Sequence, residues 1–104
     1  MADEKITVVA RIKAKPGKEQ IVKDTLMALV APTRSEAGCI NYDLHQAADD
    51  KGLFLFYENW ISKKDLDEHL ATPYLKDFLG KAGDILAEPV EITLWKMSSQ
   101  LKKT

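Results

Sequence analysis

The chain contains a single cysteine, Cys39, among 104 residues, so no disulfide can form within it. A chain without disulfides is typical of a reducing compartment, and we expect a cytoplasmic protein. Long hydrophobic runs are also lacking, because the longest, around residues 53–57, is far shorter than the roughly 20 residues that cross a bilayer. The amino terminus has acids where a signal peptide needs bases. We therefore expect neither a leader nor a membrane partner.

The chain also lacks an excess of either charge: the formal net charge is -1, and acidic and basic residues are interspersed along it. The sequence therefore shows no cluster of basic residues of the kind that binds nucleic acid. The five glycines are isolated, so no loop of the kind that cradles phosphate predicts a nucleotide or flavin cofactor. Cys39, His45 and His69 are scattered without metal-ligand spacing, so we expect no metal.

What remains is the composition of an ordinary globular protein, with 45% hydrophobic and 30% charged residues. We expect one domain over residues 1–104, with a core of about residues 5–97 and a polar tail at 98–104. Alternating apolar residues predict strands at 6–13, 39–45, 53–61 and 90–95, with a polar loop at 46–52.

Helical spacing of apolar residues predicts a first helix from about residue 17 to 30, ended or kinked by Pro32. Another turn over residues 33–37 is also open, before Gly38, which suits a left-handed cap. A second helix begins at Ser62, with Asp65 placed for a capping box, and restarts at Thr72-Pro73. The order β-α-β-β-α-β, with its second helix split, predicts an α+β, ferredoxin-like antiparallel sheet with helices on one face.

Residues 53–61 are apolar on both alternating sets, which predicts that both faces of this strand are covered. Helices can cover only one face in this fold. We therefore expect a second copy of the chain to cover the other, giving a homodimer.

Polar and aromatic residues end this apolar strand at Glu58, Asn59 and Trp60, and His69 follows two helical turns after Ser62. If that helix packs over the strand end, His69 and either Asn59 or Trp60 would line one pocket with the aromatics of the second helix. A purely structural interpretation is also open, in which Trp60 fills core, Asn59 binds a turn, Glu58 pairs with a nearby donor such as lysine and His69 is half-buried.

Two stretches carry a family resemblance: Tyr57-Glu58-Asn59-Trp60-Ile61-Ser62, and Leu66-Asp67-Glu68-His69-Leu70-Ala71-Thr72-Pro73-Tyr74. With residues 6–10, 16–17 and 34–42, they make the chain resemble the antibiotic biosynthesis monooxygenase (ABM) domain family. The spacing of Glu-x-Trp, His and Thr-Pro is similar to that of its small quinol-monooxygenase-like members. The resemblance implies a dimeric α/β-barrel and oxidation of a phenolic or hydroquinone-type substrate by O2 without metal, flavin or haem.

The resemblance also implies site residues. Asn59 and Trp60 correspond to a strand-end amide and indole that hold the substrate, and His69 to the helix histidine. Where quinol-type members often have a second histidine, this chain has Tyr74.

Our first hypothesis is a cofactor-independent monooxygenase of a small aromatic substrate. His69 is its base, Asn59 donates to the developing oxyanion, and Trp60, Phe56, Phe78 and Tyr74 wall the pocket. One alternative is a non-catalytic dimeric module that binds a small ligand. Another is an isomerase of a small phosphorylated carbonyl compound, with Lys63, Lys64 and Lys76 at the pocket mouth.

Overall fold

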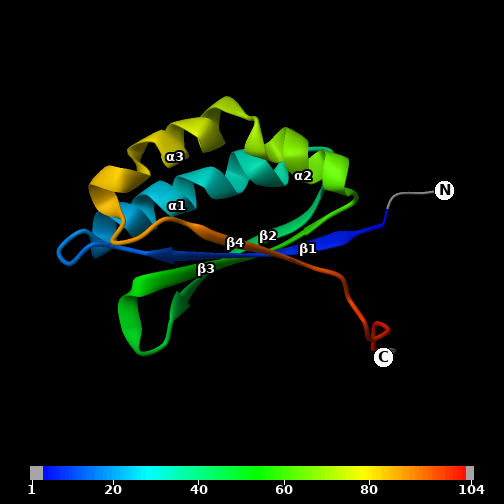
Figure 1. Ribbon diagram of the computed structural model, residues 1–104, viewed down its shortest axis with the longest axis horizontal. Helices are drawn as coiled ribbons and strands as arrows, with labels where there is room; N and C mark the ends of the chain where they lie inside the picture. The colour runs from blue at the N-terminus through cyan, green and yellow to red at the C-terminus, as the bar shows by residue number, and fades with distance from the viewer. Residues whose placement is uncertain (1–3, 103–104) are drawn as a thin grey trace.

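Three helices cover one face of a four-stranded antiparallel sheet in the computed structural model, which describes residues 4–102 (Figure 1). The elements follow one another as β1 (Ile6–Lys13), α1 (Glu19–Arg34), β2 (Cys39–Ala47), β3 (Asp50–Trp60), α2 (Lys63–Leu70), α3 (Pro73–Ile85) and β4 (Glu91–Trp95). The strand order is β2-β3-β1-β4. The predicted ferredoxin-like α+β fold with a split second helix is therefore confirmed. Within residues 4–102, no helix is long and apolar enough to cross a membrane.

The strand register decides which side chains share a face of the sheet. Val8 pairs with Glu58 and Ala10 with Phe56, and directly opposed residues point to the same face. This face carries the buried core against the helices, including Val8, Phe56 and Trp60. The opposite face, which we call the open face, has no helix over it (Figure 1) and presents Tyr57 and Trp95, 40% and 56% exposed.

Two predicted boundaries differ from the structure, at the end of the first helix and in the loop at 46–52. Helix α1 continues through Pro32 to Arg34. A proline in the last turn of a helix removes only one backbone hydrogen bond, and the helix ends two residues later. The polar loop predicted at residues 46–52 is largely strand, since the hairpin stays paired until Ala47 meets Asp50. Local polarity marks solvent exposure here, whereas strand pairing depends on the partner strand.

Gly38 does not have the predicted left-handed conformation; among the described residues Gly17 alone has a positive φ, 85°. The reason for glycine at position 38 is space. A Cβ there would lie 2.2 Å from Asp65 Cγ, so the chain before β2 can approach the start of α2 only without a side chain.

Candidate active site

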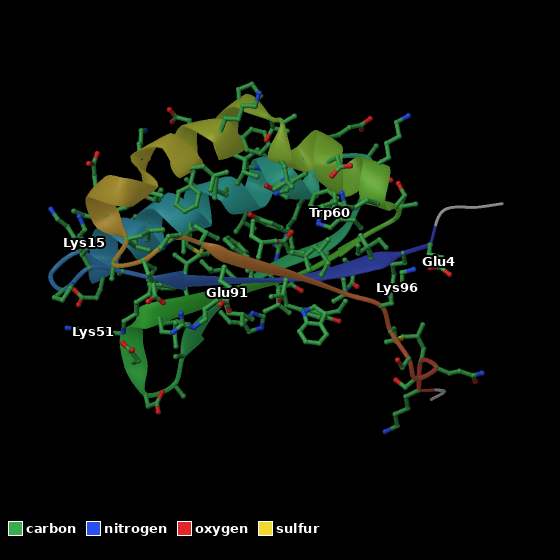
Figure 2. All side chains as sticks on the ribbon, in the orientation of Figure 1. Glu4, Lys15, Lys51, Trp60, Glu91 and Lys96 are labelled. Carbon is green, nitrogen blue, oxygen red and sulfur yellow. The ribbon has the colours of Figure 1, made fainter. Side chains whose placement is uncertain are left out.

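His69 reaches the sheet because α2 begins at a formed cap. Ser62 Oγ accepts a hydrogen bond from the Asp65 backbone N–H, as the sequence predicts, and donates one to Asp65 Oδ2 at 2.7 Å. His69 lies two turns later and is 2% exposed. Its ring packs on Trp60 with 4.6 Å between centroids. The predicted closeness of His69 and Trp60 is therefore confirmed, and Figure 2 shows Trp60 between the helices and the sheet.

Glu36, just after α1, fixes the orientation of the His69 ring. Its Oε2 lies 2.8 Å from His69 Nδ1, and the Tyr74 hydroxyl donates to the same oxygen. Because a carboxylate only accepts hydrogen bonds, Nδ1 carries the hydrogen, and Nε2 of the neutral ring is left as an acceptor. Burial and the hydrogen bond to Glu36 raise the pKa of Tyr74 to about 12, so Tyr74 stays a neutral donor. The arrangement thus presents Nε2 as the atom able to take a proton.

Glu58 brings a carboxyl group to the helix-covered face of β3. It is 4% exposed, and Trp60 Nε1 donates to its Oε1 at 2.9 Å. Burial raises the pKa of Glu58 from 4.5 to about 7, the Trp60 hydrogen bond lowers it in part, and the Glu36 charge adds to the rise. The carboxyl group therefore exchanges a proton near neutral pH. The donor expected for Glu58 exists, but it is an indole rather than a lysine.

A narrow apolar cavity lies between the sheet and the helices, with both Glu58 and His69 in its wall. The gaps between its lining side chains total about 420 Å³, including space open to solvent, but only about 30 Å³ admits the centre of a water molecule. For comparison with the smaller of these two volumes, a cavity of about 150 Å³ binds benzene. An aromatic ring can therefore enter only when lining side chains move.

Asn59 does not share this cavity, and the prediction that it could is wrong. It pairs with Thr7 and lies on the open face, one residue out of phase with Glu58 and Trp60. Thr7 Oγ1 donates to Asn59 Oδ1, and Asn59 Nδ2 donates to Asn41 Oδ1 at 2.9 Å. Asn59 is therefore part of a polar ladder across three strands, although it is only 4% exposed.

The other predicted pocket residues divide into two groups. Phe56 and Phe78 line the cavity, as expected, and Tyr42 stacks on Phe56 with 4.3 Å between ring centroids. Trp60 and Tyr74 support the site without lining it, since Trp60 packs on His69 and Tyr74 binds Glu36.

Sequence reasoning missed Glu36, Tyr42 and the cavity position of Glu58. Strand alternation contains the signal for Glu58, because it places this residue in phase with Phe56. Glu36 carries no such signal, since it meets His69 across 33 positions of sequence.

The remaining reactive side chains lie outside this cluster. Burial raises the pKa of Cys39 to about 11, so its thiol stays protonated at neutral pH. His45 is exposed, and its Nδ1 lies 3.1 Å from the Asp43 carbonyl oxygen. Within the described range of 4–102, no three His, Cys, Asp or Glu side chains group as metal ligands.

Comparison with known proteins identifies the family. The sequence profile of the family described as "Antibiotic biosynthesis monooxygenase" matches residues 5–81. This chain belongs to that family. An uncharacterized Synechocystis protein, sll1783, is 38% identical over 93% of this chain, which spans 66% of its length.

Two further relatives carry activity names, both provisional. Rv0793 of Mycobacterium tuberculosis, named a monooxygenase, is 36% identical over 86% of this chain and 87% of its own length. Its solved structure superposes with a TM-score of 0.88, at 30% identity over 95% of this chain and 100% of that one. YgiN of Escherichia coli, named a quinol monooxygenase, is 29% identical over 84% of this chain and 94% of its own length.

Proposed function

We propose that the protein is a monooxygenase that oxidises a phenolic or hydroquinone-type substrate with O2, without a cofactor. The observation that carries this proposal is the position of the His69 and Glu58 side chains in the wall of one apolar cavity. Glu36 holds His69 Nδ1, and the pKa of Glu58 is raised to about 7. The family and the quinol monooxygenase name of YgiN support the substrate class. The cytoplasmic location expected from the single cysteine stays a prediction.

In the proposed reaction, the substrate itself reduces O2 once it has lost a proton. His69 Nε2 accepts the proton of a substrate hydroxyl, because Glu36 holds the ring as that tautomer. The neutral Glu58 carboxyl donates a hydrogen bond to the developing anion, the role that sequence reasoning gave to Asn59. One oxygen atom enters the substrate and the other leaves as water. Phe56 and Phe78 exclude solvent from the intermediates.

The active form in this proposal is a homodimer formed through the open face. Tyr57 and Trp95 leave large aromatic surfaces uncovered there. The Thr7–Asn59–Asn41 ladder already satisfies polar groups at the same face, which favours its burial against a second copy. Sedimentation equilibrium tests this part. Dimers that dissociate in a Tyr57→Lys, Trp95→Lys variant support it, and a monomeric wild type would reject it.

The isomerase alternative loses its support at the cavity. A phosphorylated substrate needs basic groups at the mouth, yet no lysine or arginine that the structure describes lines the cavity. Lys63, Lys64 and Lys76 are exposed on the helices. Lys63 is bound to Asp67 Oδ1 at 2.6 Å. The isomerase is therefore not part of the proposal.

Oxygen uptake with a menadiol-type hydroquinone tests the function after metal and flavin have been stripped from the protein. The Glu58→Gln, His69→Ala double variant should lose at least about a hundredfold in rate, the usual size of general acid–base effects. Glu68→Gln is a matched control, since this side chain is exposed on α2, outside the cavity and away from the open face. A double variant that turns over at the wild-type rate would remove the mechanism. Ligand binding without turnover in the wild type would instead favour the non-catalytic module.

A further inference from the structure

A solvent-open groove continues from the outer end of the cavity. It offers about 510 Å³ between the end of α3, the segment that follows it and the start of β4. Leu79, Val90 and Ile92 line both hollows. Ala82, Gly83, Leu86, Ala87, Glu88 and Pro89 complete the wall of the groove. A molecule held against His69 and Glu58 can therefore extend outward past these three shared side chains.

Eight of the nine residues that line the groove have no polar side-chain atom. Leu79 and Ile92 are 40% and 41% exposed, so apolar surface is available for burial. Glu88 is its one ionisable lining residue, and Arg11 already binds that carboxylate. Among residues 4–102, no lysine or arginine lines the groove, which leaves a phosphate or carboxylate without a counter-charge there. An uncharged aliphatic chain, by contrast, gains free energy at each methylene that it buries there.

We propose that this groove, defined by its nine lining residues, binds an aliphatic side chain carried by the aromatic ring of the substrate. The proposal rests on the proposed function, and it narrows the substrate class to phenols or hydroquinones with an alkyl or prenyl chain. The ring occupies the cavity beside His69, and the chain passes Leu79 and Ile92 into the groove.

Two glycines of α3 offer a matched pair of variants. A Cβ at Gly83 or at Gly80 would meet nothing within 4 Å, so either position accepts a larger side chain without a clash. Gly83 lines the groove, whereas Gly80 lies outside it. Gly83→Leu therefore places a bulky side chain at the wall of the groove, and Gly80→Leu reproduces the change in helix propensity outside it.

The test is anaerobic binding of 2-alkylhydroquinones with methyl, propyl, pentyl and heptyl chains, measured by calorimetry in wild type and both variants. In the wild type we expect affinity to rise about two- to fourfold per added methylene over the first members. Gly83→Leu should bind the methyl compound normally and lose this dependence, while Gly80→Leu keeps it. Melting temperatures confirm that both variants are folded.

A flat affinity series in the wild type, or an unchanged series in Gly83→Leu, would overturn the groove proposal. Oxygen uptake separates this outcome from failure of the proposed function. Binding that depends on chain length, without oxygen consumption, rejects the proposed oxidation and supports the groove proposal. Oxygen consumption with a flat affinity series supports the oxidation and rejects the groove proposal. Failure of every member to bind rejects both.

Discussion

His69 Nδ1 lies 2.8 Å from Glu36 Oε2, and this contact determines which nitrogen of the ring is available for chemistry. It joins the segment after α1 to α2. His69 is 3% exposed in its side chain and Glu36 18%, so solvent competes little for the hydrogen bond.

Replacing Glu36 should allow the His69 ring to adopt both neutral tautomers. In Glu36→Ala we expect long-range proton–nitrogen NMR spectra to show hydrogen on both ring nitrogens of His69 in mixture, instead of on Nδ1 alone. The turnover number should fall on the order of tenfold to a hundredfold with little change in KM, because a positioning residue affects proton transfer more than binding. Tyr74→Phe is the control: it removes a donor to Glu36 but keeps the acceptor for His69. A wild-type spectrum with hydrogen on Nε2 would contradict this assignment.

The raised pKa of Glu58 predicts a pH-dependent stability. The folded protein holds this proton up to about pH 7, whereas the unfolded chain releases it near 4.5. The stabilisation is therefore full below pH 4.5 and is lost as pH rises to 7, by about 3 kcal/mol at most. Glu58→Gln keeps an acceptor for Trp60 and should remove this slope. Denaturant titrations across pH 4–8 measure it, and identical slopes in both proteins would show that Glu58 titrates normally.

Trp60→Phe should raise the pKa of Glu58 further, because it removes the hydrogen bond that stabilises the charged carboxylate. Unfolding free energy should fall by about 1–3 kcal/mol because the buried carboxyl group loses its hydrogen-bond partner, and the pH slope should extend above 7. Trp95→Phe provides the comparison, since its indole is 56% exposed and bonded to Thr93. If the two variants gave the same pH profile, the Trp60–Glu58 bond would have no part in setting this pKa.

Much of the fold was predictable because periodicity reports burial. Alternation and helical spacing located every strand and helix, whereas the hairpin end was missed since pairing depends on the partner strand. At the site, local patterns predicted the capped helix and the nearness of His69 to Trp60. Strand alternation alone places Glu58 on the helix-covered face and Asn59 on the open face. The site residues were instead assigned from the family resemblance, which pointed to Asn59. The contact of Glu36 with His69 depends on how the helices pack, and no local sequence pattern predicts it.

Gly38→Ala should destabilise the protein by about 1–3 kcal/mol, because the new Cβ would fall within 2.5 Å of three Asp65 side-chain atoms. Asp65 cannot retreat without losing its contacts with Ser62 at the helix cap. Gly80→Ala is the matched change in open space and should stabilise by about 0.5–1 kcal/mol. Thermal denaturation of both decides the matter, and equal melting temperatures would mean that the Gly38 approach is not tight.

The most direct test of the central claim is a single turnover of an alkylhydroquinone with oxygen-18-labelled O2, using protein freed of metal and flavin. We predict that one labelled atom enters the product and the other is released as water, and that the Glu58→Gln, His69→Ala protein yields no labelled product above the uncatalysed background. Product without label from the wild type, or equal labelling by the double variant, would contradict the account.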